Sequence, residues 1–165
     1  MVSLDPSLRG FGWAAWKAGE LAGCGVIAAP DELRNLDAWL YLSYEVGSAA
    51  ARLVGGPVEI VGEKPQVYRG SKADPDDLLQ LAGALGAVAG HLRGVGLLAA
   101  ETWTPTPRQW KGNRPKEVTS AAAMRALTPE ETLRLNDCLA TVNEAARHNA
   151  MDAVALGLRY LKRMR

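Results

Sequence analysis

Cysteine, histidine and aromatic side chains are scarce in this 165-residue chain, which has two cysteines, two histidines and a single phenylalanine. Cys24 and Cys138 stand far apart, and neither belongs to a Cys-x-x-Cys or Cys/His cluster. Zinc binding is therefore not expected, since structural zinc sites draw on closely spaced Cys and His ligands. We expect both thiols to be small side chains that are mostly buried.

The sequence also lacks an apolar run long enough to span a bilayer, and its first residues lack the basic and apolar segments of a signal peptide. Apolar residues make up 48% and charged residues 22%, which are ordinary values for a globular protein. The length fits one domain with a sizeable core. We therefore expect a single domain over residues 1–165, located in the cytoplasm and without a membrane partner.

The chain also has no large excess of either positive or negative charge, because its net charge is only +1. The distribution is nevertheless uneven. Four cations fall within nine residues that contain no acid, namely Arg108, Lys111, Arg114 and Lys116. A local basic strip on a nearly neutral protein can bind phosphates, so this pattern favours nucleic acid as the partner.

What the sequence does contain is a regular succession of strand and helix patterns. Apolar segments between turn signals predict strands over 2–5, 11–17 and 21–28, and their short connections predict antiparallel pairing. Each later strand follows a helix, which predicts right-handed crossovers and parallel pairing. The later elements are a helix at 30–53, a strand at 58–62, a helix at 74–92, a strand at 95–102, and helices at 115–127, 129–142 and 143–164. This order predicts an α/β, RNase H-like fold, with a mixed five-stranded sheet (three antiparallel strands, then two parallel) and helices on both faces.

Three acids occupy positions from which their side chains can meet. Asp5 ends the first strand and Glu63 follows the fourth, and sites in open α/β sheets form at the carboxyl ends of such strands. Asp152 lies on the last helix, with His148 four residues and Asn149 three residues before it, so all can share one face. Taken singly, each acid has an ordinary explanation, as a turn former, a solvated loop residue or half of a polar pair.

Together these acids suit a hard divalent cation such as Mg²⁺, which prefers oxygen ligands. Two ions about 4 Å apart can clamp the attacking and leaving oxygens of a phosphodiester. Phosphoryl transfer needs little beyond such positioning and charge neutralisation. We predict a site for two Mg²⁺ ions, with Mn²⁺ as a substitute, whose ligands come from Asp5, Glu63, His148, Asn149 and Asp152.

Four segments, in order along the chain, resemble the RuvC family of Holliday junction resolvases. Residues 5–13 (Asp-Pro-Ser-Leu-Arg-Gly-Phe-Gly-Trp) resemble the family's opening strand and turn, and residues 62–68 (Gly-Glu-Lys-Pro-Gln-Val-Tyr) resemble its second acidic motif. Residues 149–153 (Asn-Ala-Met-Asp-Ala) resemble the start of its last helix. The Trp-Lys-Gly and Pro-Lys pattern within residues 110–116 is similar to bacteriophage versions. The resemblance covers nearly the whole chain.

The resemblance implies a metal-dependent endodeoxyribonuclease that resolves four-way junctions by paired symmetric cuts, as a two-fold homodimer. The catalytic residues that it implies are Asp5, Glu63, His148, Asp152 and Lys116, with Lys116 close to the cleaved phosphate. Bacterial members usually have Asp where Asn149 stands, and the RuvC-like domain of Cas9 has a His-rich segment similar to residues 148–153. The fourth ligand therefore stays open among His148, Asn149 and Glu144. We favour His148, whose near-neutral pKa suits proton transfer or metal binding.

Aromatic and basic residues extend the predicted DNA contact. Tyr68 matches an aromatic residue that, in the family, contacts bases at the junction centre. Trp110 is interpreted as a stacking residue for an unpaired base, and Trp103 as a core anchor. The predicted DNA-binding residues are Lys64, Tyr68, Arg69, Lys72, Arg108, Trp110, Lys111, Arg114 and Lys116.

The helix at 74–92 contains Gly83, Gly86 and Gly90, each of which costs about 1 kcal/mol in a helix interior relative to Ala. Close approach of the sheet or of a second subunit would explain them. We predict a homodimer through this helix.

Three rival functions remain open. One is an RNase H-fold nuclease for flaps, other branched DNA or RNA–DNA hybrids. Another is a non-catalytic junction-binding module, which the intact set of Asp5, Glu63 and Asp152 disfavours. The third is a nucleotide-binding protein of the actin and sugar-kinase class, which needs a second similar domain that 165 residues cannot supply.

Overall fold

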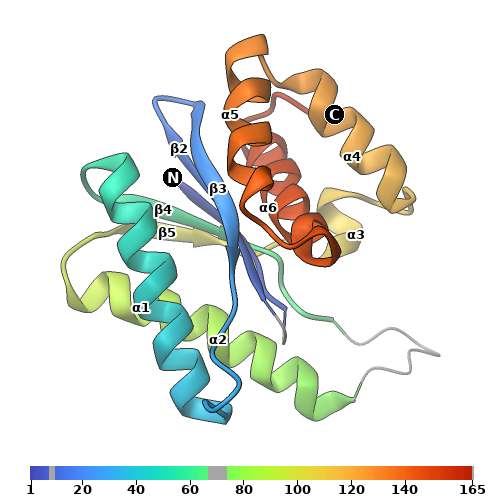
Figure 1. Ribbon diagram of the computed structural model, residues 1–165. Coiled ribbons are helices and arrows are strands. Elements are labelled where there is room, and N and C mark those ends of the chain that lie inside the picture. Colours follow the sequence, from blue (N-terminus) through green and yellow to red (C-terminus); the bar gives the residue numbers. More distant parts are fainter. Residues whose placement is uncertain (8–9, 67–73, 165) are drawn as a thin grey trace.

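One mixed sheet runs through the centre of the protein, with helices on both faces (Figure 1). The structure is a computed structural model that describes residues 1–7, 10–66 and 74–164. The strands are β1 (Val2–Asp5), β2 (Phe11–Lys17), β3 (Glu20–Ile27), β4 (Val58–Gly62) and β5 (Leu98–Trp103). The helices are α1 (Asn35–Val54), α2 (Pro75–Gly94), α3 (Pro107–Trp110), α4 (Lys116–Ala126), α5 (Pro129–Ala140), the 3₁₀ turn η1 (Glu144–Ala146) and α6 (Arg147–Tyr160).

The sheet has the spatial order β3-β2-β1-β4-β5. The pairs β1–β2 and β2–β3 are antiparallel, whereas β1–β4 and β4–β5 are parallel. The predicted α/β class, RNase H-like sheet and strand directions are thereby confirmed. Because β1 and β4 are parallel neighbours, with Leu4 opposite Gly62, their carboxyl ends meet at one edge of the sheet.

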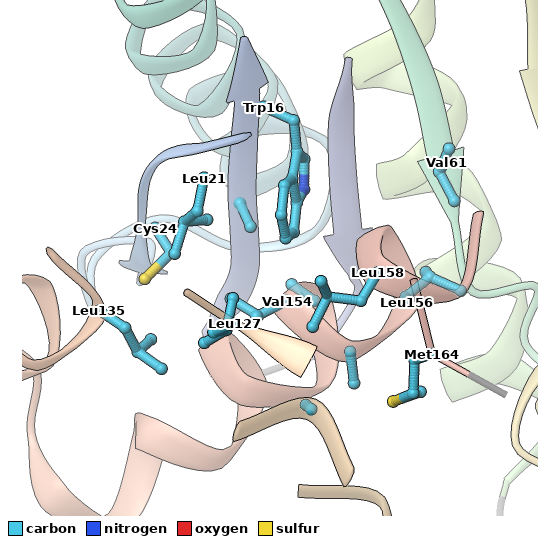
Figure 2. Close-up of a cluster of buried hydrophobic side chains, with 14 of the residues drawn as sticks. Trp16, Leu21, Cys24, Val61, Leu127, Leu135, Val154, Leu156, Leu158 and Met164 are labelled. Carbon is cyan, nitrogen blue, oxygen red and sulfur yellow. The ribbon is translucent and has the colours of Figure 1, made fainter. Parts of the chain in front are cut away.

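Each face of the sheet has its own apolar core, as the alternation of side chains along a strand requires. In β4, Ile60 packs with the core beneath α1 and α2, while its neighbour Val61 belongs to the core beneath α4, α5 and α6. Figure 2 shows the second core, in which Trp16 of β2 lies against the apolar side of α6 near Val154 and Leu158. The sheet is therefore a rigid middle layer from which the strand ends project.

Three predicted element starts shift by three residues or more. The first helix begins at Asn35 and not at residue 30, because the Pro30 carbonyl accepts a hydrogen bond from the Leu33 N–H in a turn. The strand predicted at 95–102 begins at Leu98, after a turn in which Gly96 has a φ of +72°. The last helix begins at Arg147, because residues 144–146 form the separate turn η1.

The short helix α3 was not predicted, since Thr-Pro-Thr-Pro at 104–107 was interpreted as irregular. Thr106 and Gln109 form a capping box around it, and Pro107 occupies the first helical position, where its missing N–H costs nothing. None of the helices in the described ranges is long and apolar enough to cross a membrane.

Candidate active site

Asp5 and Glu63 lie next to each other at the carboxyl edge of the sheet. Asp5 is the last residue of β1, and Glu63 follows directly after β4. The Glu63 N–H donates to the Leu4 carbonyl at 3.1 Å, so the ladder between the two strands continues as far as both acids. The predicted meeting of these two strand ends is confirmed.

Asp152 reaches the same edge from α6, whose start presses against β2. A Cβ placed on Gly12 would lie 2.1 Å from the Asn149 carbonyl oxygen, so only glycine permits this approach. Gly12 is the direct partner of Asp5 in the β1–β2 ladder. The first turn of α6 is therefore held over Asp5, and Asp152 is buried one turn later.

The three carboxyl groups interact electrostatically. Burial, then the charges of Asp152 and Glu63, raise the pKa of Asp5 well above its ordinary value, although Lys111 and Lys116 oppose this shift. Asp5 is thus a desolvated carboxyl between two other acids. Such an arrangement stores repulsion that a bound cation would relieve.

Glu63 is held by two residues at the end of α3. The Trp110 indole Nε1 donates to Glu63 Oε2 at 2.6 Å, and Lys111 Nζ lies 3.2 Å from the same oxygen. Lys111 Nζ also lies 4.8 Å from the centroid of the Trp110 ring, within the range of a cation–π contact. These contacts fix one oxygen of Glu63 and give the carboxylate a defined orientation.

Asp152 has a matching partner, because Lys116 Nζ lies 3.3 Å from Asp152 Oδ2. Lys116 is the first residue of α4 and is partly exposed, whereas the Asp152 side chain is buried. Two lysines from the basic strip therefore neutralise the two acids that flank Asp5. The sequence predicted both cations as DNA contacts but did not predict these pairings.

The structure separates the candidates for the fourth ligand. Asn149 is buried, and its Nδ2 donates to the Gly10 carbonyl at 2.8 Å, so it ties α6 to the turn after β1. His148 is exposed at the second position of α6, and Glu144 is exposed in η1. The roles of His148 and Asn149 in metal binding stay predictions.

In the described residues, no group of three or more Asp, Glu, His or Cys side chains is arranged to hold a metal ion. Glu63 is instead paired with Lys111, and Asp152 is paired with Lys116. The chemistry of the donors nevertheless fits a hard divalent cation, because three carboxylates converge on one edge and Asp5 is flanked by like charge.

The predicted DNA-binding residues other than Trp110 fall into three groups. Arg108, Arg114 and Lys116 are exposed and Lys111 is half-buried, all on the segment around α3 and the start of α4. Lys64 is exposed directly after Glu63. The remaining three, Tyr68, Arg69 and Lys72, lie outside the described residues.

The two tryptophans differ from their predicted exposure. Trp110 is 4% exposed, so its ring is buried and its part in the site is the hydrogen bond to Glu63, not stacking on a base. Trp103, interpreted as a core anchor, is 36% exposed. The sequence pattern does not separate the two because both tryptophans lie beside Thr, Pro or basic residues near the same turn.

A buried ion pair that was not predicted supports the same side of the sheet. The Arg163 guanidinium donates to both carboxylate oxygens of Glu131 on α5, at 2.7 and 2.5 Å. The same carboxylate accepts hydrogen bonds from the backbone N–H groups of Leu21 and Thr128. Although burial alone would raise it, these hydrogen bonds lower the pKa of Glu131 to about 2. The network joins the β2–β3 hairpin, α5 and the segment after α6. The pattern Thr128-x-x-Glu131, a capping box, is its one local signal.

The sheet and its helices form an α/β fold with three acids at one carboxyl edge. The amino-acid sequence itself matches no protein-family model and no curated protein. The structure is similar to that of RuvC from Thermus thermophilus, with a TM-score of 0.60 at 21% identity over 96% of this chain and 92% of that one. RuvC from T. thermophilus in complex with a Holliday junction substrate matches over the same shares, with a TM-score of 0.56 at 21% identity.

A eukaryotic protein has the same fold. The yeast mitochondrial Holliday junction resolvase Ydc2 matches with a TM-score of 0.60 at 12% identity, over 98% of this chain and 78% of that one. The predicted RuvC-like fold is therefore confirmed at low sequence identity.

Proposed function

We propose that this chain is a metal-dependent endodeoxyribonuclease that resolves four-way DNA junctions by paired symmetric cuts. The observation that carries the proposal is the half-buried Asp5 between Glu63 and Asp152, at the sheet edge of a fold shared with RuvC. One solved neighbour was determined with a Holliday junction substrate, and another is a Holliday junction resolvase.

Each residue of the site has a role in this proposal. Asp5, Glu63 and Asp152, with His148 or Asn149, would hold two Mg²⁺ or Mn²⁺ ions. When bound, the ions supply charge neutralisation at the phosphate and a nucleophile from water. Lys116 and Lys111 turn from their acids to the phosphate as the DNA arrives, which exchanges one ion pair for another. Lys64, Arg108 and Arg114 bind flanking phosphates, and Tyr68, Arg69 and Lys72 are proposed to contact the junction centre.

The test is cleavage of a synthetic four-way junction in Mg²⁺ or Mn²⁺ by the wild type and by Asp5→Asn. We expect paired symmetric nicks from the wild type, and binding without cleavage from the variant, with a rate loss on the order of 10³-fold or about 4 kcal/mol. Linear duplex, flap and RNA–DNA hybrid of the same sequence serve as controls. Faster cutting of a flap or hybrid would replace the junction as substrate. Junction binding without cutting by the wild type would make the chain a binding module.

Paired cuts require two active sites, so the proposal includes a homodimer through α2. Leu79 of α2 is 69% exposed, and nothing lies within 4 Å of a Cβ placed on Gly86 or Gly90, so this face is open to a second subunit. Gly83 has a different explanation, because its absent Cβ would lie 2.8 Å from the Trp39 ring of α1. That contact lies within the chain and involves neither the sheet nor a partner.

The dimer is tested by the mass in solution at micromolar concentration. We expect a dimer for the wild type and a monomer for Leu79→Glu. Leu133→Glu, an equally exposed leucine on α5 at 66%, is the matched control and should stay dimeric. A wild-type monomer across micromolar concentrations would contradict the assembly while leaving cleavage to be judged separately.

A further inference from the structure

A hollow of about 600 Å³ lies beside the end of β5 and the end of α6. We call it the Trp103 pocket, after the residues that characterise it: Trp103, Gln109, Arg159, Tyr160 and Lys162. Trp103 is the last residue of β5 and stands opposite Val61, so it is at the same carboxyl edge of the parallel strands as Asp5 and Glu63. The pocket is thus next to the candidate active site but holds none of its acids.

A second hollow of about 280 Å³ on α3 adjoins the Trp103 pocket. The two hollows share Gln109 and Arg159. The second is also lined by Trp110 and Lys111, the residues that hold Glu63. A strand that leaves the acids along α3 would therefore enter the Trp103 pocket.

The pocket presents an aromatic surface made of Trp103 and Tyr160, of which Tyr160 also packs against the core beneath α4, α5 and α6. Trp103 and Tyr160 lie with ring centroids 5.6 Å apart and an interplanar angle of 40°, and Trp103 is 36% exposed. Glu59 of β4 accepts a hydrogen bond from the Tyr160 hydroxyl at 3.3 Å and so helps to fix that ring. A fixed, partly open pair of rings is a platform for a planar ligand.

The charge of the two hollows is of one sign. Together their lining contains the cations Arg108, Lys111, Arg114, Arg159 and Lys162, and no Asp or Glu. Phosphates are the ligands that suit such a lining, and bases are the planar groups that suit the rings. A duplex hides its base faces in the stack, so the combination favours an unpaired strand over double-stranded DNA.

We propose that the Trp103 pocket binds an unpaired segment of the DNA strand at the cleavage site, with a base on Trp103 and Tyr160 and phosphates on Arg159 and Lys162. The proposal rests on the proposed function only in taking DNA as the substrate. It adds the element that distinguishes a junction, whose strands open at the branch, from a linear duplex.

The first test is binding of a fluorescent oligo-dT to the full chain, followed by anisotropy in Ca²⁺. We expect Trp103→Leu to weaken binding about 10-fold or more, since stacking contributes about 1–3 kcal/mol per base, and Trp103→Phe to restore most of it. Tyr44→Leu, which removes an aromatic ring that is 58% exposed on α1, should bind like the wild type. Binding by Trp103→Leu within twofold of the wild type would overturn the proposal.

The charges are tested by the dependence of oligo-dT affinity on salt. Arg159→Ala should reduce the slope of log K against log salt by about one, whereas Arg52→Ala, an exposed cation on α1, should leave it unchanged. Equal slopes for both variants would contradict the phosphate contact.

A measurement on the wild type avoids any doubt about folding of the variants. Ultraviolet cross-linking of an oligonucleotide with 5-iododeoxyuridine should give an adduct on Trp103 or Tyr160, located by mass spectrometry. An adduct on other aromatics alone would overturn the pocket. Junction cleavage by the same preparation separates this proposal from the proposed nuclease function. An adduct in the pocket without cleavage would contradict the nuclease function, and cleavage without the adduct would contradict DNA binding by the pocket.

Discussion

The two faces of the sheet differ in what holds their helices. Beneath α1 and α2 the contacts are apolar and close, as where Trp39 covers Gly83. Beneath α4, α5 and α6 an apolar core is supplemented by the buried Glu131–Arg163 pair and by the tie from Asn149 to Gly10. The polar contacts are directional, whereas apolar packing alone tolerates small shifts.

The catalytic candidates divide in the same way. Asp152 belongs to α6 and Lys116 to α4, on the face that carries the Glu131–Arg163 pair. Trp110 and Lys111, at the end of α3, lie on the same side. On the other side α1 exposes Leu36, Leu40 and Tyr44, which are four residues apart and form one stripe. The difference indicates that directional contacts are placed where side chains must be held to a fraction of an ångström.

The largest expected effect on stability comes from breaking the buried Glu131–Arg163 ion pair. Glu131→Gln should destabilise the protein by about 3–5 kcal/mol, because Arg163 is left without its partner and the hairpin contact at Leu21 weakens. Chemical denaturation of the wild type and variant measures the loss. Glu45→Gln, the same exchange at a half-buried position of α1, is the control and should stay within about 0.5 kcal/mol. Equal effects would remove the contrast between the faces.

The same carboxylate predicts a pH window. The folded pKa of Glu131 is about 2, below the ordinary value of 4.5. Its stabilisation is therefore complete above pH 4.5 and is lost as the pH falls toward 2. Acid unfolding curves should show that Glu131→Gln lacks this part of the slope between pH 4.5 and 2. A variant with the wild-type slope would show that other carboxyl groups control acid unfolding.

A smaller effect is expected from a single methyl group at the start of α6. Gly12→Ala would set a Cβ 2.1 Å from the Asn149 carbonyl oxygen, so α6 must shift and carry Asp152 with it. We expect junction cleavage to fall on the order of 10²-fold, as misplacement by about 1 Å can cause. Gly56→Ala, in the turn before β4, has open space around it and should leave cleavage unchanged. Unchanged cleavage by Gly12→Ala would show that α6 is not positioned by this contact.

The sequence predicted what local pattern and strand direction determine. Asp5 and Glu63 were placed together because parallel pairing of their strands puts both strand ends at one edge. Asp152 was placed by its position on a helix whose apolar side packs on the sheet.

Side-chain contacts between segments far apart in the sequence could not be predicted from local pattern or strand direction. Trp110 meets Glu63 across 47 residues, and Glu131 meets Arg163 across 32, with no periodicity to connect them. The local half of each contact was visible, since Thr106 with Gln109 and Thr128 with Glu131 are capping boxes that place a helix start. The partner across space depends on how α3 and α5 pack, which one sequence does not specify.

Trp110→Phe sharpens the comparison at the site itself. The variant keeps the buried ring but loses the hydrogen bond to Glu63, so the carboxylate is less well oriented. We expect the Mg²⁺ concentration for half-maximal cleavage to rise about 10-fold, as is typical when a contact that orients a metal ligand is removed, with the saturated rate recovering in excess metal. Trp39→Phe, on the α1 side, is the matched control. Equal metal dependence in both variants would leave Trp110 as a core residue only.

The smallest expected effect concerns whether the ionised Asp5 carboxylate lowers the stability of the folded protein. Since burial and the charges of Asp152 and Glu63 raise the pKa of Asp5, its ionised form is unfavourable in the folded state, and stability is lost as the pH rises through the folded pKa. Asp5→Asn removes that charge, so in EDTA at pH 8 it should melt at a higher temperature than the wild type, and the gain should shrink as the pH falls. Mg²⁺ should raise the melting temperature of the wild type more than that of Asp5→Asn, because ions that bind the folded state stabilise it. A variant less stable than the wild type in EDTA at pH 8 would show that the Asp5 carboxylate is stabilised by Lys111 and Lys116 more than it is strained by its acidic neighbours.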